Sequence, residues 1–377
     1  MAAKKTSGVA RIGGRLEPFV DDWLIERMRG AELRLHSPVE RNVALAFDRP
    51  WEGDTSAYVT VFQDGGLFRM YYRGSSTRDG MKRQVTCYAE SRDGVEWMRP
   101  DLGHVEFNGS RANNIVWDGY GHHNFTPFRD TNPACDPKQR FKALGGDMKT
   151  GLNAFVSEDG LKWSMLRETP VFTSGAFDSQ NLAFWDAERG RYAMYFRVFD
   201  NGLRSISVCY SKDFVTWSRP KPLTYGGAPQ EHLYTNAVTP YFRAPHIYLG
   251  FPKRFVPDRK VVEEDKGGVS DGLFMSSRDG VAWKRWGEAF IRPGPRRDRW
   301  INRNNMPAWG LLQTQAGPGL PDEISLFASE GYYTPANRLR RLTVRVDGFV
   351  SVHAGFKGGQ IVTKPLTFKG RALAMNF

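Results

Sequence analysis

Three acidic residues stand in short polar stretches that each come just before an apolar, strand-like run. The stretches are W-E-G-D-T-S-A-Y, F-D-S-Q-N and Q-E-H-L-Y-T-N, and the residues of interest in them are Asp54, Asp178 and Glu231. Carboxylates that meet across a cleft can share acid–base chemistry, because one donates a proton while another attacks or activates water. Cleavage of a glycosidic bond needs such a pair, and a third carboxylate can stabilise charge and tune pKa values.

A repeated motif indicates which elements must position these residues. Ser-x-Asp-Gly-x-x-Trp occurs at 91–97, 157–163 and 277–283, with a degenerate copy at 211–217 and a shorter one, V-D-G-F, at 346–349. The tryptophans of the first four copies in chain order are 66, 54 and 66 residues apart, which predicts five units. Asp and Gly suit a tight turn, because Asp accepts backbone N–H bonds and Gly tolerates positive φ. We therefore interpret the motif as structural and expect its Trp to pack against a neighbouring unit.

Each unit has the pattern of four antiparallel strands. Two aromatic-rich runs joined by a tight turn, as in 58–72 and 182–196, have the alternation of a hairpin. A third run precedes each Asp-Gly turn, and the segment after the Trp starts a short fourth strand. Repeated five times, this pattern predicts an all-β fold, a five-bladed β-propeller of four-stranded antiparallel blades.

The repeats divide the chain of 377 residues into three parts. Residues 48–353 are expected to form the propeller. Residues 1–47 are expected to be an N-terminal extension, in which F-V-D-D-W-L-I-E (19–26) is a strand that lies across the blades or completes the last one. Residues 354–377 have the pattern of C-terminal strands, and their abrupt end is compatible with the start of a truncated β-sandwich.

Aligning the units on their hairpin turns, where Asp64, Asp130 and Asp186 are equivalent, shows which residues line the centre. The first strand of each blade lines the channel of a propeller, so the polar residues that enter it converge. Besides the three carboxylates, the candidates for substrate binding are Glu52, His122, His123, Asn124, Gln180, Tyr234, Asn236, Arg303, Asn305 and Glu330. Each has a structural alternative, either packing in the channel or a salt bridge. Glu52 also competes with Asp54, because residues two apart in a strand share a face.

On these residues and repeats the chain resembles the five-bladed β-propeller glycoside hydrolases, the superfamily of families 32, 43, 62 and 68, and is most similar to family 32 N-terminal-domain-like proteins. The resemblance implies that Asp54 is the nucleophile or general base, that Asp178 stabilises the transition state and that Glu231 is the general acid. The F-R-D of family 32 occurs at 128–130 and offers Asp130 in place of Asp178. We prefer Asp178, because Asp130 aligns with turn residues. The W-x-N-D-P-N-G motif of family 32 is absent, and E-G-D-T-S stands where it would be.

The leading hypothesis is an enzyme, a glycoside hydrolase of carbohydrate metabolism and polysaccharide degradation that acts on a furanoside or on an acidic or sulfated glycan. An alternative is a glycoside phosphorylase on the same fold, similar to family 130, whose phosphate ligands would be Arg303, His232, Lys253 and Arg254. A further alternative is a non-catalytic carbohydrate-binding propeller. The expected partner is an oligo- or polysaccharide, with no cofactor and no catalytic metal. A structural ion in the channel and the oligomeric state are left open.

Charge and cysteine content limit the classes of partner and the cellular locations that are expected. The net charge of +12, with many arginines in 292–303, suits either an anionic partner or solubility alone. We expect neither nucleic acid, because no recognisable nucleic-acid module accompanies the charge, nor a membrane, because no apolar stretch of about 18 residues occurs. Cys87, Cys135 and Cys209 lack metal-ligand spacing and are expected to be buried. The start of the chain lacks the apolar run of a signal peptide, so we expect a periplasmic or secreted protein if such a peptide has been removed and a cytoplasmic one otherwise.

Overall fold

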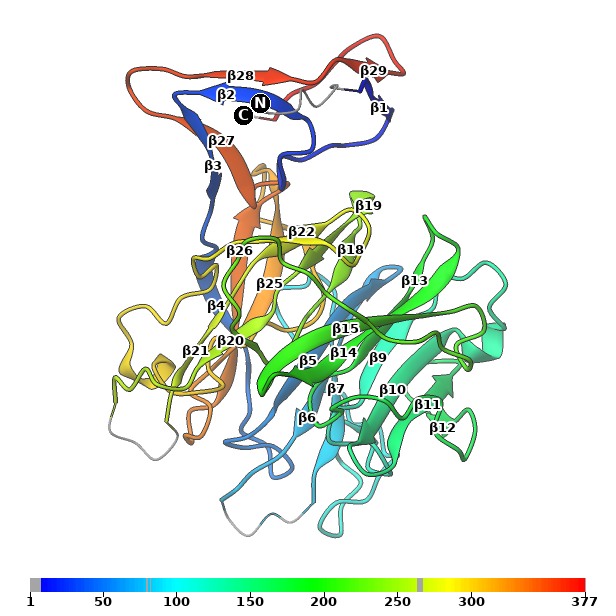
Figure 1. The fold of residues 1–377 in the computed structure, drawn as a ribbon. Coiled ribbons are helices and arrows are strands. Elements are labelled where there is room, and N and C mark those ends of the chain that lie inside the picture. Colours follow the sequence, from blue (N-terminus) through cyan, green and yellow to red (C-terminus); the bar gives the residue numbers. More distant parts are fainter. Residues whose placement is uncertain (1–7, 79–80, 82, 263–266, 377) are drawn as a thin grey trace.

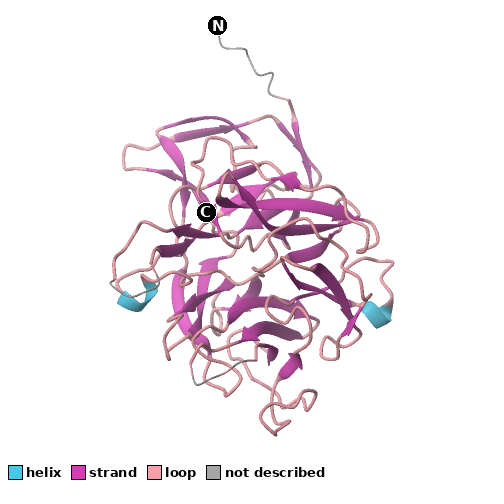
Figure 2. Ribbon diagram, turned by 60° about the horizontal axis from the view of Figure 1, so that its bottom comes forward, coloured by secondary structure: helices cyan, strands magenta, loops and turns pink. Residues whose placement is uncertain are grey.

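The computed structural model describes residues 8–78, 81, 83–262 and 267–376, so that residues 1–7 and 377 of the expected terminal segments lie outside it. Within these ranges the regular structure is all strand apart from two 3₁₀ turns, η1 (Pro137–Gln139) and η2 (Arg297–Arg299), at the periphery in Figure 2. No helix in the described chain is long and apolar enough to cross a membrane. The all-β prediction is confirmed.

Five four-stranded antiparallel sheets form the body of the described chain, and we number them sheet 1 to sheet 5 (Figure 1). Sheets 1 and 2 contain β5 (Ala57–Asp64), β6 (Leu67–Gly74), β7 (Val85–Ser91) and β8 (Ile115–Trp117), then β9 (Thr126–Arg129), β10 (Phe141–Asp147), β11 (Gly151–Ser157) and β12 (Ser164–Met165). Sheets 3 and 4 contain β13 (Leu182–Asp186), β14 (Arg191–Asp200), β15 (Leu203–Ser211) and β16 (Lys221–Pro222), then β18 (Thr239–Tyr241), β19 (Ala244–Gly250), β22 (Met275–Ser277) and β23 (Trp283–Arg285). Sheet 5 contains β24 (Leu312–Gln315), β25 (Asp322–Glu330), β26 (Arg338–Arg345) and β4 (Val39–Ala46).

Sheet 5 is completed by a strand from the N-terminal region, because β4 pairs antiparallel with β26. The stretch 19–26 does not have this role. It leads into β2 (Ile25–Arg29) of a separate terminal module, where Leu24 is buried and Asp21 pairs with Arg278 of the β22–β23 turn. The module projects from one end of the sheets (Figure 1) and pairs β1 with β29, β2 with β28 and β3 with β27. Its other strands are β1 (Ala10–Gly13), β3 (Ala31–Leu35), β27 (Val350–Ala354), β28 (Gln360–Thr363) and β29 (Leu366–Phe368).

The connections of sheet 4 carry a further three-stranded sheet, which we call the insert sheet. Its strands are β17 (His232–Leu233), β20 (Lys253–Val256) and β21 (Val269–Gly272). β20 lies in the middle and pairs antiparallel with both neighbours. The insert sheet therefore brings the chain before β18 next to the chain after β19.

The repeated motif forms the turn that follows the third strand of sheets 1 to 4. Its aspartates accept hydrogen bonds of 2.7–2.9 Å from the backbone N–H groups two and three residues further on; they are Asp93, Asp159, Asp213 and Asp279. The following residue has positive φ, 73° at Gly94 and 66° even at Phe214 of the degenerate copy. Burial would raise the pKa of Asp213, but the backbone hydrogen bonds outweigh it and lower that pKa to about 2. The turn chemistry expected from the motif is confirmed.

Three of the motif tryptophans pack against a neighbouring sheet, whereas the Trp217 ring lies against Phe214 of its own turn. The Trp163 ring of sheet 2 lies 6.4 Å from Tyr71 of sheet 1, and the Trp283 ring of sheet 4 lies 6.2 Å from Tyr195 of sheet 3. Trp97 of sheet 1 lies 5.8 Å from Phe327 of sheet 5. These contacts confirm the expected packing, and the last of them places the first and last sheets side by side.

The inner hairpins also join the sheets. Arg129 of sheet 2 lies 3.2 Å from the carboxylate of Asp64, and the Tyr192 hydroxyl of sheet 3 donates to Asp130 at 2.6 Å. Asp130 is buried and is also paired with Lys142 at 2.7 Å. Cys87 and Cys209 are buried as expected. The prediction that Cys135 is buried is wrong, because Cys135 is partly exposed in the loop before η1.

Candidate functional site

Side chains from sheets 1, 2, 3 and 5 and from the insert sheet meet around three buried tyrosines. We call this set the central cluster; its members are Tyr58, Tyr234, Tyr332, Arg73, Arg197, Arg204, Lys253, Arg303 and His123. Most members of the cluster come from the inner ends of sheet strands or from the loops that enter them. These are the places where the sequence predicts convergence.

Two phenols form the middle of the central cluster. The hydroxyl groups of Tyr58 and Tyr234 are 3.1 Å apart, and the side chains are almost wholly buried. Positive φ values of non-glycine residues gather here, at Tyr58 (55°), Arg303 (73°) and Tyr333 (70°). Such conformations cost free energy and persist where the surrounding structure enforces them, which is common at functional sites.

Basic side chains surround the two phenols. The Lys253 ammonium lies 4.1 Å from the centre of the Tyr234 ring, and the guanidinium carbon of Arg73 lies 4.6 Å from the centre of the Tyr58 ring. The guanidinium groups of Arg197, Arg204 and Arg303 lie 5.1 to 5.6 Å from the Tyr234 ring. Cation–π contacts of this kind strengthen when water is excluded.

The electrostatics of the central cluster shift several pKa values. Burial, together with the neighbouring arginines, holds the pKa of Lys253 well below its usual range. Burial and the charge of Arg73 lower the pKa of His123 to about 3, so its imidazole is neutral. Burial would raise the pKa of Tyr234, but the charge of Arg303 and the hydrogen bond from Tyr58 outweigh it and lower this pKa. The site therefore disfavours further positive charge and favours negative charge.

Of the three expected catalytic carboxylates, the structure brings Asp178 to the central cluster. Its side chain is 52% exposed and forms an ion pair with Arg197. Its backbone carbonyl lies 3.3 Å from both the Tyr58 hydroxyl and Nε2 of His123. Asp178 thus stands at the solvent side of a cluster whose floor is buried.

Asp54 reaches the same region through its backbone. Its carbonyl oxygen accepts the N–H of Tyr333 at 2.7 Å. Its buried carboxylate accepts the Thr77 hydroxyl at 2.6 Å and the Thr77 N–H at 2.7 Å, and Arg78 lies 3.6 Å away. The carboxylate of Asp54 is therefore occupied by the loop after β6.

Glu231 lies on the other face of the insert sheet. It is held by Arg254, at 2.9 Å, and by Arg285. Arg254 follows Lys253 in β20, and adjacent strand residues point to opposite faces. Of the four residues expected to bind phosphate, Lys253 and Arg303 are thus in the central cluster. Arg254 faces away, and the His232 ring accepts the backbone N–H of Arg204 at 3.1 Å.

The remaining expected residues belong to the framework or to other networks. Four buried amides donate to backbone carbonyls near the site and hold its loops; they are Asn124, Gln180, Asn236 and Asn305. Nδ1 of the half-buried His122 lies 2.7 Å from the Gly119 carbonyl. Glu52 accepts the Tyr72 hydroxyl at 2.5 Å and pairs with Arg99; burial raises its pKa although Arg99 opposes this. Glu330 is buried among four arginines, described in the Discussion.

Sequence reasoning missed Arg73 and Arg197, yet the repeat contains their signal. The serine that begins the repeated motif pairs with Phe68 in sheet 1, Tyr192 in sheet 3 and Tyr248 in sheet 4. Five residues further along, the same position in the three units is Arg73, Arg197 and Lys253. The aligned hairpin runs, 58–72 and 182–196, end one residue short of the two arginines.

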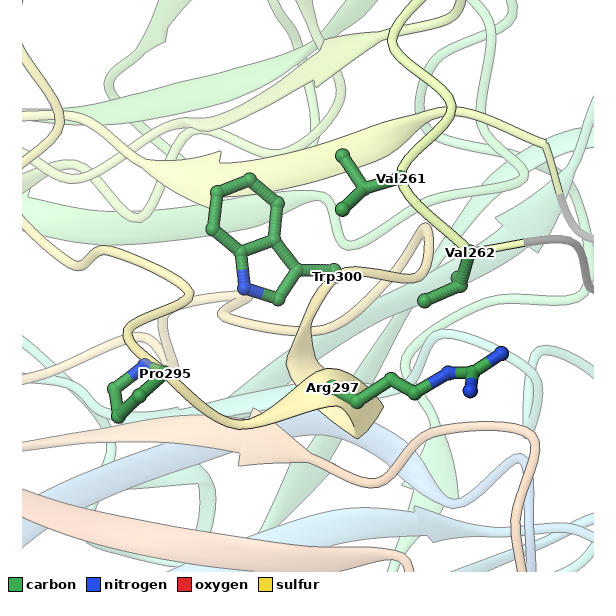
Figure 3. A pocket seen from close by; sticks show the side chains of 5 residues that line it. All are labelled: Val261, Val262, Pro295, Arg297 and Trp300. Atoms are coloured by element: carbon green, nitrogen blue, oxygen red, sulfur yellow. The ribbon is translucent and has the colours of Figure 1, made fainter.

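No group of three or more His, Cys, Asp or Glu side chains in the described residues could hold a metal ion. Figure 3 shows a pocket of about 480 Å³ lined by Val261, Val262, Pro295, Arg297 and Trp300. A larger groove of about 1290 Å³ lies between the terminal module and sheet 4, beside Trp23 and Arg278. Neither hollow is lined by a member of the central cluster.

Comparison with known sequences yields a partial match. No family model matches the chain. Two uncharacterized proteins of Mycobacterium tuberculosis, from strains CDC 1551 and H37Rv, are 32% identical to it over 123 residues. The match covers 29% of this chain, which spans about a third (34%) of the length of these relatives.

Comparison of structures shows the fold. A glycoside hydrolase matches with a TM-score of 0.55 and 15% identity, over 82% of this chain and 92% of its own. The catalytic domain of the GH62 α-L-arabinofuranosidase of Coprinopsis cinerea gives 0.52 and 11%, over 82% and 97%. An N-acetylgalactosamine deacetylase of F. plautii, in complex with blood group B trisaccharide, gives 0.51 and 11%, over 88% and 96%. The chain therefore has a fold that is found in glycoside hydrolases and in a deacetylase that binds an oligosaccharide.

Proposed function

We propose that the chain is an enzyme that cleaves a glycosidic bond of an oligo- or polysaccharide at the central cluster. In this proposal the five sheets are the blades of a five-bladed β-propeller. The ring is supported by hydrogen bonds between the first and last sheets, where the Trp309 N–H donates to Val59 and the Val61 N–H to Trp309, both at 2.8 Å. The glycoside hydrolases among the structural neighbours support the choice of reaction.

The observation that carries the proposal is the convergence of polar groups at one site with a buried floor and a solvent-exposed carboxylate. Tyr58 and Tyr234 are buried, whereas Asp178 is 52% exposed and His123 and Arg303 are half-buried. Convergent polar groups, together with strained backbone and shifted pKa values, are typical of an active site.

The proposed roles follow from exposure and partners. Asp178 is the principal catalytic carboxylate, because it alone of the three expected acids lies in the central cluster with a side chain open to solvent. Asp54 is the preferred second carboxylate, because its backbone carbonyl already contacts the central region at Tyr333, although its carboxylate would have to leave Thr77 to reach a substrate. Glu231 is the other candidate and would have to leave Arg254 and Arg285 to reach a substrate. Removing an acid–base group lowers turnover by roughly 10²- to 10⁴-fold.

A panel of neutral, uronic-acid and sulfated glycans, assayed for the release of reducing ends, tests the proposal. We expect Asp178→Asn to lower kcat/KM at least about 100-fold. Asp200→Asn, an exposed change at the end of β14, is the matched control and should leave the rate unchanged. Asp54→Asn and Glu231→Gln identify the second carboxylate. Saccharide binding without turnover by the wild-type protein would replace the proposal with a non-catalytic binding propeller.

Phosphorolysis is the second candidate, and the position of Lys253 and Arg303 in the central cluster favours it. Arg303 presents positive charge and Lys253 an amine in the same cluster as the exposed carboxylate of Asp178, so a phosphate held there could act in place of a second carboxylate. Turnover that depends on inorganic phosphate and yields a sugar phosphate would select this reaction. Turnover that is unaffected by phosphate would select hydrolysis.

A further inference from the structure

We infer that the central cluster is a binding site for an oxyanion, either a carboxylate, sulfate or phosphate group carried by the sugar or free inorganic phosphate. This inference deepens the proposed function and rests on it only for the statement that the ligand includes a sugar. The evidence is a surplus of basic groups, their burial, their unpaired nitrogens and their common register.

The surplus is visible in the ion pairs. Four guanidinium groups and one amine surround the two phenols, at Arg73, Arg197, Arg204, Arg303 and Lys253. In the described part of the chain, only one carboxylate pairs with a member of this set: the carboxylate of Asp178 pairs with Arg197. The other polar contacts of Arg73 and Arg303 are to neutral groups, including the Tyr332 hydroxyl at 3.0 and 3.3 Å.

The basic groups are also buried, which makes the surplus costly. Arg73 is 4% exposed, Arg197 3% and Lys253 0%. Charged side chains are almost never fully buried unless they are paired. Several of their nitrogens find no hydrogen-bond partner among the residues that the structure describes, namely Nε of Arg73, Nε and Nη1 of Arg197 and Nε of Arg204. An anion in this place would supply the missing charge and acceptors.

The register of the sheets aims three of these groups at one region. Arg73 of β6 and Arg197 of β14 occupy the same position of equivalent strands. Lys253 stands at the same count along its unit but lies in β20 of the insert sheet, and all three side chains reach the two phenols. The corresponding position of sheet 2 is Gly146, which stands five residues after Phe141, the residue that pairs with the motif serine Ser157. A Cβ at Gly146 would meet backbone atoms of Gly151 and Leu152, so the glycine there permits the close pairing of β10 with β11.

The chemistry of these groups suits oxyanions. A guanidinium presents planar N–H donors that match carboxylate, sulfate and phosphate oxygens, and an ammonium adds a point charge. A neutral sugar would leave the same groups unpaired, so the site should discriminate strongly against it. Because Asp178 occupies Arg197 at the solvent side, an incoming oxyanion competes with its carboxylate.

Calorimetric titration and Tm measurements of the full chain, at constant ionic strength, test the inference. The probes are sodium phosphate, sodium sulfate and sodium glucuronate, and glucose is the neutral control. We expect saturable binding of at least one oxyanion, a matching rise in Tm and no response to glucose. Arg197→Met should weaken binding at least tenfold, and Arg204→Ala, at the half-buried rim, provides a second variant if Arg197→Met fails to fold. Arg167→Ala, an exposed arginine after β12, is the matched control and should not change binding.

The probes distinguish the sources of the anion. Binding of glucuronate in preference to phosphate indicates a charged group on the sugar, and the reverse preference indicates free phosphate. Asp178→Asn should retain or strengthen binding, because it removes the competing carboxylate, although it abolishes turnover. No saturable binding of any oxyanion, or equal losses in Arg167→Ala and Arg197→Met, would overturn the inference. Turnover of neutral glycans without oxyanion binding would overturn the oxyanion inference and leave the proposed function standing. Oxyanion binding without turnover would overturn the proposed function and leave the oxyanion inference standing.

Discussion

Two arginine-rich regions of the molecule differ in how their charge is balanced. Around Glu330, four arginines share the acids of their own chain. Arg338 and Arg340 lie 2.9 and 3.0 Å from the buried Glu330, and Arg296 lies 3.1 Å from it. Arg299 pairs with Glu40, and Asp298 pairs with Arg296 and Arg338. We call this set the Glu330 network. It contains three acids for four arginines and needs no ligand.

The central cluster has similar burial but one acid, Asp178, and that acid is half exposed. Buried ion networks stabilise a fold when every member is satisfied and cost free energy when a member lacks a partner. The comparison suggests that arginines serve architecture in the Glu330 network and ligand binding in the central cluster. The following predictions test that distinction.

The largest effect on stability is expected in the Glu330 network. Glu330→Gln removes the carboxylate that four arginines share, so we expect the free energy of unfolding to fall by about 3–5 kcal/mol. Denaturant unfolding measures this change. Glu288→Gln, which breaks an exposed ion pair with Arg292, is the control and should cost less than about 1 kcal/mol. A loss of similar size in both variants would contradict the structural role of the network.

The opposite sign is expected in the central cluster. Lys253→Met removes a buried amine that donates to Asn302 at 3.0 Å but has no carboxylate partner among the described residues, so the free energy of unfolding should rise by about 0.5–2 kcal/mol at neutral pH. The folded pKa of Lys253 is lowered by burial and by Arg303, Arg204 and Arg197, so wild-type stability falls as the pH drops below the unfolded value of about 10.4.

The gain from Lys253→Met should therefore increase as the pH decreases from about 10, while the Tm response to oxyanions disappears. Denaturant unfolding at several pH values measures the gain. Destabilisation at every pH would mean that the protein itself supplies the partners of this amine, and the contrast with the Glu330 network would fail.

A smaller, pH-dependent effect is expected at His123. Its folded pKa of about 3 lies below the unfolded value of about 6.5, so its contribution to stability is complete above 6.5 and is lost between 6.5 and about 3. His123→Gln should flatten the decline in the free energy of unfolding over this range. Parallel pH profiles for the variant and the wild type would show that the imidazole is not kept neutral by burial and Arg73.

An effect on stability alone is expected at the repeated turns, which belong to neither arginine region. Asp279→Ala removes hydrogen bonds to the N–H groups of Val281 and Ala282 and should cost about 1–2 kcal/mol of stability. The oxyanion response and any glycan turnover should stay unchanged. Loss of turnover in a folded Asp279→Ala protein would contradict the purely structural role of the motif.

Much of the fold could be predicted because local turn chemistry and strand alternation repeat along the chain. The Asp-Gly turns at 93–94, 159–160 and 279–280 require only contacts between neighbours in sequence, so the pattern identifies them. The sequence indicates 19–26 as a strand that either lies across the blades or completes the last one. It does not identify β4 as the strand that completes sheet 5, because the pairing of β4 with β26 depends on contacts about 300 residues apart.

The site was predicted in part for the same reason. The loops before the inner strands identified Asp178, Tyr234 and Arg303, since the register of the repeats locates them. The partners of Glu231 could not be predicted, because Arg285 lies 54 residues away and reaches it only in the folded chain. The repeat aligns Arg73 with Arg197, but the alignment of two basic residues does not by itself indicate a reaction, whereas paired carboxylates do.

The central claim is that the central cluster is an active site for an anionic carbohydrate. The most direct test compares the initial rate of reducing-end release from a uronic-acid polymer with the rate from the same polymer after its carboxyl groups have been reduced to alcohols, with and without phosphate. We predict that the wild-type protein cleaves the acidic polymer at least about 100-fold faster, and that Asp178→Asn abolishes the cleavage while Asp200→Asn retains it. Equal or faster cleavage of the reduced polymer in the absence of phosphate, or full activity of Asp178→Asn, would contradict the account.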